Sequence, residues 1–338
     1  MSEQANGPSL TPAEISERLE QALFEIRRVI AGQDAMLERV LVCLLAQGHL
    51  LIEGVPGLAK TLTIKTTAGV LGGSFARVQF TPDLVPADLV GTRVYRPDQG
   101  TFDTELGPVF CNFLLADEIN RAPAKVQSAL LEVMQERQVT IAHDTFPVPE
   151  PFHAMATQNP IESEGTYPLP EAQIDRFMLK ILIGYPEHDE ELTIVQRQLV
   201  AAPELREALS LDELRALQAA AFDVYVDPSL VSYAVALATA TREPAEAGLP
   251  ELAEYVEYGA SPRGPISVVQ ASRALALLRG RDYATAEDVR ALAKDAFRHR
   301  LVLSYQALAE NVTPDAILER VLNAVPMPDV SPVRPRAT

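Results

Sequence analysis

The chain has 338 residues, 47% of which are hydrophobic, and its formal net charge is −17 at pH 7. This length and apolar content predict a globular protein with two domains. So acidic a surface disfavours nucleic acid and anionic lipid as partners, and no apolar run approaches the roughly 20 residues of a membrane-spanning helix.

The amino-terminal residues, MSEQANGPSL, are polar and contain no hydrophobic signal segment, so we expect a cytoplasmic protein. A capping box at residues 11–14 begins the first predicted helix, and a break at Gly32 ends it. Asp34 is expected to cap a second helix. Because Cys43 and Cys111 both lie in apolar runs, we expect them to be buried, reduced thiols.

A glycine-rich segment, GVPGLAKT at residues 54–61, follows a predicted strand over residues 49–53 and leads into a predicted helix over residues 60–71. A loop of this kind receives a polyphosphate on its backbone amides and on the amino terminus of the helix. Lys60 would supply positive charge to the β- and γ-phosphates, and the Thr61 hydroxyl could hold Mg²⁺. Alone, the segment could also be a Gly/Pro turn with a solvated lysine.

A long insertion separates the second predicted strand, residues 76–80, from the third. It covers residues 81–108 and contains a hairpin with its turn at residues 97–100. The third strand is the apolar run 113–116, which ends in an aspartate and a glutamate. A buried parallel strand presents such carboxylates at its carboxyl end, where ligands bind in open α/β sheets.

A helix, a second hairpin and two strands complete the first predicted domain, which covers residues 1–185. The hairpin occupies residues 137–148, and a strand over residues 152–157 leads to Asn159. A short helix then places Arg176 just before the last strand. Polar groups are therefore predicted at the ends of several strands.

The second predicted domain covers residues 186–325 and is helical. Capping boxes begin helices at Ser210 and Thr285, and strand patterns disappear. A loop with the sequence SPRG at residues 261–264 precedes another predicted helix. The proline-rich tail, residues 326–338, is expected to be disordered.

The polar residues at the ends of these elements are of the types that ATP hydrolysis requires. A hydroxyl and a carboxylate, those of Thr61 and Asp117, would hold Mg²⁺. Glu118 would orient and deprotonate a water molecule, and the Asn159 amide would help to position it. The charge that develops on the γ-phosphoryl group needs a cation, and an arginine in this role contributes about 10³ to 10⁵ in rate.

Each of these residues also has an interpretation without a nucleotide. The Asp-Glu pair could cap the following helix, and Asn159 is a common turn residue. Arg176 could pair with Asp175 or Glu171 at the surface, and the sequence around Arg263 is a common turn. The order of the clusters along the chain favours the nucleotide site.

Five phrases of the sequence resemble the AAA+ ATPases of the MoxR family. They are GVPGLAKT at 54–61, FLLADEINRAP at 113–123, ATQNP at 156–160, LPEAQIDRF at 169–177 and SPRG at 261–264. The match extends from about Val29 to the helices near residue 300. Ala59 departs from the general phosphate-loop pattern but suits loops of this type. The resemblance implies an α/β AAA+ P-loop core with a parallel sheet flanked by helices, followed by a small all-α lid domain.

The resemblance identifies Lys60 and Thr61 with Walker A. It identifies Asp117 and Glu118 with Walker B, and it implies that Thr61 and Asp117 hold Mg²⁺. Residues 29–33 resemble the segment that lines the adenine pocket in AAA+ proteins. The residues that we therefore expect to bind ATP are Gly32, Gln33, Gly54, Val55, Pro56, Gly57, Leu58, Ala59, Lys60, Thr61 and Leu62.

The resemblance also implies roles for three polar residues outside the Walker motifs. Asn159 would be sensor 1, Arg176 the finger that acts on a neighbouring subunit's ATP, and Arg263 sensor 2. The insertion at 81–108 resembles the helix-2 insertion, and the hairpin at 137–148 resembles the pre-sensor-1 insertion. Both insertions are expected to face a central pore or a partner.

By the same resemblance we expect a homo-oligomeric ring, a hexamer, in which hydrolysis of ATP between subunits moves the helical domain against the core. The expected function is that of a chaperone-like factor that remodels, assembles or activates a client protein, with a von Willebrand factor A domain protein as partner. A nucleic-acid motor is one alternative, which the net charge of −17 disfavours. A small-molecule P-loop kinase, in which lid arginines act within one chain, is another.

Overall fold

A five-stranded parallel sheet lies at the centre of the first domain in this computed structural model, which describes residues 12–55, 60–160, 166–199 and 203–329. The strand order is β2-β5-β8-β1-β9. The bounds are β1 (Leu50–Gly54), β2 (Phe75–Gln79), β5 (Phe113–Asp117), β8 (His153–Gln158) and β9 (Leu179–Ile183). The prediction of an α/β domain with a parallel sheet is confirmed.

Both faces of the sheet are covered, which explains why its strands are apolar runs. Successive strand residues point to opposite faces, so Leu50 and Ile52 belong to one hydrophobic cluster and Leu51 to another. Helices on one face share the first cluster, and a helix on the other face shares the second. They are α1 (Pro12–Val29), α2 (Asp34–Leu45) and α3 (Lys60–Val70) on the first and α5 (Ala124–Glu136) on the second.

The start of α2 differs from the prediction that Asp34 caps the helix. Asp34 is the first helical residue, and the residues before it, Gly32 and Gln33, have φ values of 66° and 55°. These two left-handed residues turn the chain between α1 and α2. The Asp34 carboxylate accepts a hydrogen bond from Arg27 Nε at 2.9 Å instead of capping α2. The capping box predicted at residues 11–14 begins outside the described residues.

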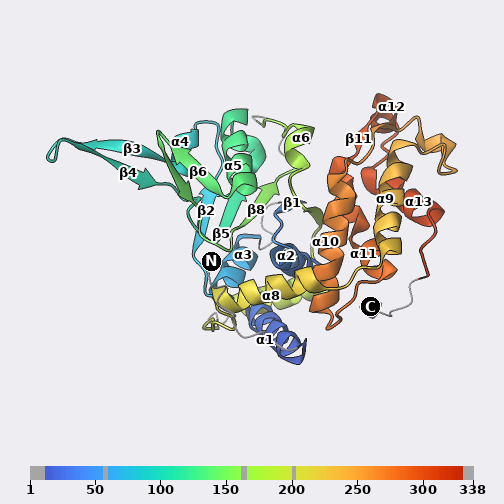
Figure 1. Ribbon diagram of the computed structural model, residues 1–338, viewed down its shortest axis with the longest axis horizontal. Coiled ribbons are helices and arrows are strands. Elements are labelled where there is room, and N and C mark those ends of the chain that lie inside the picture. The colour runs from blue at the N-terminus through green and yellow to red at the C-terminus, as the bar shows by residue number, and fades with distance from the viewer. Residues whose placement is uncertain (1–11, 56–59, 161–165, 200–202, 330–338) are drawn as a thin grey trace, which may run out of the picture.

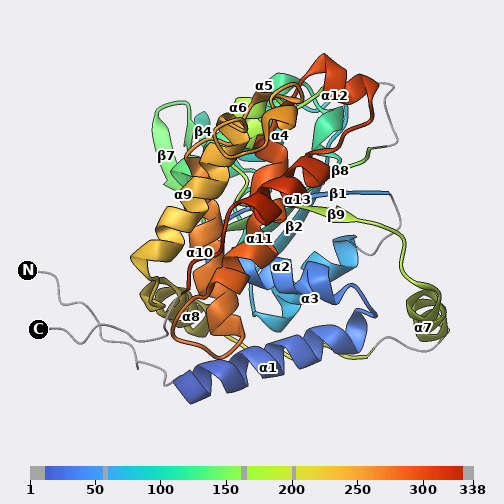
Figure 2. The ribbon, with the colours of Figure 1, turned by 90° about the vertical axis from the view of Figure 1, so that its right-hand side faces the viewer.

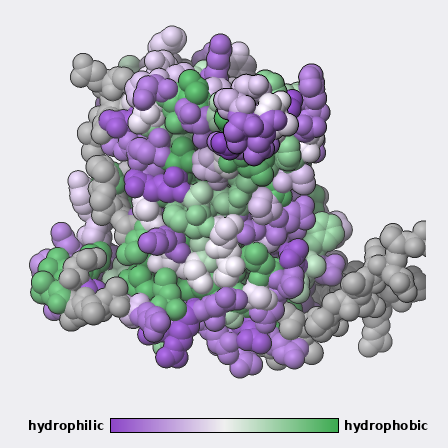
Figure 3. Space-filling model, turned by 90° about the vertical axis from the view of Figure 1, so that its left-hand side faces the viewer, coloured by the Kyte–Doolittle hydropathy of each residue, from purple (hydrophilic) through white to green (hydrophobic). Residues whose placement is uncertain are grey.

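Two hairpins leave the α/β domain, as predicted. The longer one, β3 (Gly91–Arg96) and β4 (Thr101–Leu106), follows the short helix α4 (Pro86–Val90) and extends away from the body (Figure 1). The other consists of β6 (Gln138–Ile141) and β7 (Asp144–Pro147). The side of the molecule that carries the long hairpin mixes hydrophilic and hydrophobic side chains (Figure 3).

The second domain is a bundle of helices beside the sheet (Figure 1). Its helices are α8 (Leu211–Asp223), α9 (Pro228–Arg242), η2 (Pro250–Leu252), α10 (Arg263–Leu278), α11 (Ala286–Phe297), η3 (Arg298–Arg300), α12 (Tyr305–Ala309) and α13 (Pro314–Ala324). The helix that precedes them, α7 (His188–Gln198), stands apart from this bundle (Figure 2).

The predicted capping boxes of this domain are present. The Ser210 hydroxyl accepts a hydrogen bond from the backbone N–H of Glu213, and the Thr285 hydroxyl accepts one from that of Asp288. A small antiparallel pair, β10 (Val256–Tyr258) and β11 (Val302–Leu303), was not predicted, because strands this short show no periodicity. No described helix is long and apolar enough to cross a membrane.

Both cysteines are buried and free, as the sequence predicted. Burial raises the pKa of the two thiols, in Cys111 to about 12 and in Cys43 still further. Since the thiolate is the reactive form, neither side chain is suited to nucleophilic chemistry at neutral pH.

Candidate functional site

Polar residues of four strands meet at the carboxyl edge of the sheet. Gln79 of β2 lies beside Asp117 of β5 in the parallel register, and Gln158 of β8 lies beside Glu53 of β1. The buried Asn159 therefore follows β8 next to the end of β1. This edge is where an open α/β sheet binds its ligand.

The positively charged side chain of Lys60 lies at this edge, between the end of β1 and the start of α3. Lys60, the first residue of α3, is half-buried, and its Nζ donates a hydrogen bond to the Gly54 carbonyl oxygen. Burial lowers the pKa of Lys60, and the charges of Asp117 and Glu118 counteract that shift. A Cβ on Gly54 would lie 2.7 Å from the Ile183 carbonyl oxygen, so only glycine fits there.

The structure describes some of the expected ATP-binding residues and not others. Val55 follows β1, Thr61 lies in the first turn of α3, and Leu62 is exposed. The backbone of Gly32 packs against Glu190 of α7, which begins shortly after β9 ends. Four expected residues lie outside the described residues, namely Pro56, Gly57, Leu58 and Ala59.

Thr157 connects the Asp117 carboxylate, at the end of β5, to the backbone of Glu118. Its hydroxyl donates to Asp117 Oδ1 at 2.6 Å and accepts from the backbone N–H of Glu118 at 2.8 Å. The second oxygen of Asp117 accepts a hydrogen bond from Arg77 Nη2, also at 2.6 Å. The interpretation of the Asp-Glu pair as a helix cap is wrong, because neither α5 nor the short η1 (Ile119–Arg121) has a side-chain cap.

The Glu118 carboxylate is held above the sheet edge by two neighbours. Its Oε2 accepts a hydrogen bond from Gln79 Nε2 at 2.8 Å and lies 3.0 Å from Arg121 Nη1. Glu118 itself has a φ of 56°, a left-handed conformation that costs a non-glycine residue about 1–2 kcal/mol. A strained carboxylate at a ligand-binding edge is a candidate catalytic group.

The oxygens at this edge suit Mg²⁺. Thr61 and Asp117 offer a hydroxyl and a carboxylate, the donor types that Mg²⁺ accepts when phosphates and water supply the other ligands. The guanidinium of Arg77 on Asp117 Oδ2 indicates that this oxygen attracts a cation. Among the described residues, no group of three or more His, Cys, Asp or Glu could hold a metal ion. The residues present fit a magnesium ion that arrives with a nucleotide.

The two predicted arginines lie at the opposite end of the sheet. β1 and β9 run parallel, with Leu50 beside Leu179 and Gly54 beside Ile183. Lys60 follows the carboxyl end of β1, whereas Arg176 precedes the amino end of β9, and the strand between these ends spans roughly 13 Å. The structure therefore brings Lys60 near the carboxylates of Asp117 and Glu118, but not the arginines with them.

Arg176 follows α6 (Glu171–Ile174) and contacts α5. Its Nη1 donates to the Leu131 carbonyl oxygen at 3.2 Å, its buried Nε has no partner among the described residues, and it lines a hollow of about 320 Å³. The interpretation that Arg176 pairs with Asp175 is wrong, since the Asp175 carboxylate pairs with lid residues instead. One of these is Arg263, whose Nη1 lies 3.5 Å from Asp175 Oδ2.

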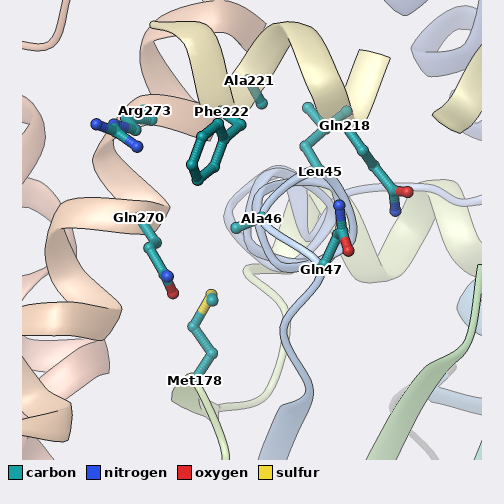
Figure 4. Close-up of a pocket in the computed structure, with 9 residues that line it drawn as sticks. All are labelled: Leu45, Ala46, Gln47, Met178, Gln218, Ala221, Phe222, Gln270 and Arg273. Carbon is teal, nitrogen blue, oxygen red and sulfur yellow. The ribbon is translucent and has the colours of Figure 1, made fainter. Parts of the chain in front are cut away.

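A second hollow, of about 420 Å³, opens at the same end of the sheet as Arg176. It lies between the end of α2, α8 and α10, where Met178, Phe222 and Arg273 approach one another (Figure 4). The Arg273 guanidinium carbon lies 5.3 Å from the centre of the Phe222 ring. Because this hollow lies across the sheet from Lys60, it is separate from the predicted phosphate site.

Both domains match known families. Residues 49–179 match the ATPase family associated with various cellular activities (AAA), and residues 251–321 match the AAA lid domain. The chain is 43% identical to a protein from Cytophaga hutchinsonii, assigned as an ATPase, whose crystal structure superposes with a TM-score of 0.89. That alignment covers 94% of this chain and 97% of the other.

Two curated relatives are similar over almost the whole chain. Chaperone MoxR1 of Mycobacterium tuberculosis is 56% identical over 315 residues, which are 93% of this chain and 84% of the relative. Protein MoxR of Methylorubrum extorquens is 32% identical over 329 residues, which are 90% of this chain and 93% of the relative.

Proposed function

Because the chain belongs to the MoxR family of AAA ATPases, we propose that it hydrolyses Mg-ATP and couples hydrolysis to the remodelling or assembly of other proteins. The observation that carries this proposal is the cluster of Lys60, Asp117 and Glu118 at the carboxyl edge of the sheet. It combines a cation for phosphates with one carboxylate for a metal and one for a water molecule.

Each residue of the cluster has a separate task. Lys60 and the backbone of the phosphate loop bind the nucleotide, and Thr61 and Asp117 hold Mg²⁺, which when bound neutralises charge on the phosphates. Thr157 fixes the orientation of Asp117. Glu118 accepts the proton of the attacking water, which Asn159 helps to position.

We propose that both arginines act on the ATP of another subunit. Arg176 precedes the amino end of β9, and Arg263 contacts Asp175 at that same end, away from Lys60 of the same chain. A head-to-tail ring, which we propose is a hexamer, would place both arginines on the ATP of the next subunit. The Nε of Arg176 has no hydrogen-bond partner among the described residues, which supports a role for this side chain in binding a group from another subunit.

The partners in this proposal are proteins. We propose a cytoplasmic hexamer that acts on a client together with a von Willebrand factor A domain protein, and that does not bind nucleic acid. The printed name of the 56% identical relative, a chaperone, supports this class, and the net charge of −17 disfavours DNA. Tight, salt-dependent binding of DNA would instead favour the motor alternative.

A mixing experiment tests the proposal. Arg176→Ala subunits bind ATP but provide no finger, and Lys60→Ala subunits provide a finger but bind no ATP. We expect each variant alone to be nearly inactive and the mixture to recover part of the wild-type turnover. A wild-type monomer with full activity, or a mixture that stays inactive, would favour a kinase-like site completed within one chain.

A further inference from the structure

The carboxylate of Asp175 is the centre of a network between the two domains. Arg300 Nε donates to its Oδ1 at 2.7 Å, and the Ser261 hydroxyl lies 2.8 Å and 3.0 Å from its two oxygens. Arg263 Nη1 lies 3.5 Å from Oδ2. Asp175 directly precedes Arg176, so this network is attached to the backbone of the proposed finger.

Arg300 makes this network part of the lid's attachment to the core. Its side chain is only 1% exposed, and it also donates to the backbone oxygens of Asp175, Phe177 and Met178. Burial lowers the pKa of Arg300 to about 10, and the charge of Asp175 counteracts the shift. A buried guanidinium without its counter-charge would be strongly unfavourable, so the two groups hold each other in place.

The neighbouring lid residues attach to the same strand without touching Asp175. His299 Nε2 lies 3.0 Å from the Phe177 carbonyl oxygen, and Arg298 donates to that of Lys180. Arg298 has two counter-charges of its own, the carboxylates of Asp315, at 2.8 Å, and Asp295. The lid therefore attaches to the segment 175–180, which leads into β9, through three consecutive buried residues. Of these three, only Arg300 contacts Asp175.

We propose that Asp175 is a positioning residue that holds Arg176 and Arg263 as one unit for the neighbouring subunit's nucleotide. The inference rests on the proposed function. When the lid moves, Arg300 and Ser261 pull on Asp175 and so move the finger that follows it. A change of the lid in one subunit thereby reaches the ATP of the next.

The experiment uses mixed rings in which one variant, the donor, provides the arginines and another, the acceptor, binds ATP. The donor carries Lys60→Ala, the acceptor carries Arg176→Ala, and only acceptor ATP next to donor arginines can be hydrolysed. Asp175→Asn is placed in either chain. We expect at least a tenfold fall in kcat, with KM changed less than twofold, when the donor carries it. We expect no change when the acceptor carries it.

Two further variants distinguish positioning from folding. Ser261→Ala in the donor removes hydrogen bonds to Asp175 but leaves its charge opposite Arg300, so we expect a smaller fall in kcat with an unchanged melting temperature. Asp315→Asn in the donor removes one of the two counter-charges of Arg298, so we expect a lower melting temperature and an unchanged kcat.

The outcomes divide clearly. Equal losses from donor and acceptor, no loss from the donor, or a loss with Asp315→Asn as large as that with Asp175→Asn would overturn the role of Asp175. A mixture of donor and acceptor that both keep Asp175 serves as the control. If this mixture recovers no activity, the proposed action of the arginines across subunits is wrong, and this result does not depend on the role of Asp175.

Discussion

Acidification from pH 7 to pH 5 should destabilise the folded protein through three buried imidazoles. His49, His153 and His299 are all buried, and burial is the main cause that lowers the pKa of each below its ordinary value of 6.5. For His153 the value falls to about 4, and nearby Arg137 lowers it further while a hydrogen bond to the Gly48 carbonyl oxygen opposes the shift.

The sign of the effect follows from which state binds protons. Below pH 6.5 the unfolded chain protonates these histidines, whereas the folded chain does not, so stability is complete above that pH and is lost as the pH falls. With a folded pKa of about 4 for His153, the loss between pH 7 and pH 5 is about 2 kcal/mol. Burial also lowers the pKa of His49 and His299 well below 6.5, so both add to the loss of stability in the same direction.

The assay is urea unfolding at pH 7 and pH 5, followed by far-UV circular dichroism because the chain has no tryptophan. In His153→Asn the amide can replace the donor to Gly48, so we expect the loss on acidification to be about 2 kcal/mol smaller than in the wild type. His143 is exposed in the turn between β6 and β7, and its replacement by Asn should leave the loss unchanged. Equal losses in wild type and His153→Asn would refute the reasoning.

Four substitutions test the site and the lid. Lys60→Ala should abolish ATP binding measured by calorimetric titration, and unchanged affinity would overturn the phosphate-loop assignment. Glu118→Gln should bind ATP normally but hydrolyse it about 10² to 10⁴ times more slowly, and near wild-type turnover would exclude it as the base. Thr157→Val removes the hydrogen bond that orients Asp117, so the Mg²⁺ concentration for half-maximal activity should rise about tenfold. Asp288→Asn leaves lid arginines opposite a fully buried neutral group, so lid stability in urea should fall by about 3 kcal/mol or more.

The sequence was most informative where a residue's role depends on its own strand or helix. The apolar run before Asp117 predicted a buried parallel strand, and the hydroxyls of Ser210 and Thr285 predicted the helix caps that the structure contains. The cap predicted at Asp34 was wrong, because two left-handed residues before it turn the chain, and its carboxylate faces Arg27. The capping preference of an aspartate does not reveal that its carboxylate will pair with an arginine of the preceding helix.

Contacts across strands could not be predicted in the same way. Gln79 contacts the Glu118 carboxylate, and Arg77 and Thr157 contact that of Asp117. In each pair, 39 or 40 positions separate the partners in the sequence. The only sequence signal was that Arg77 and Gln79 are the polar positions of an alternating strand, which is also the pattern of a solvated face. Their partners depend on the strand order and register of the sheet.

The separation of the arginines from the phosphate loop follows from the direction of β9. The chain order of the motifs suggests one continuous site, but a parallel strand has its two ends at opposite edges of the sheet, and Arg176 precedes β9 whereas the phosphate loop follows β1. On the proposed function, one chain presents a nucleotide end and an arginine end that differ from each other. Contacts between two such ends would be head to tail, and they would close into a ring only if the rotation between subunits divides a full turn. On the proposed function, the network at Asp175 would link the position of the lid in one subunit to the arginines that contact the next subunit.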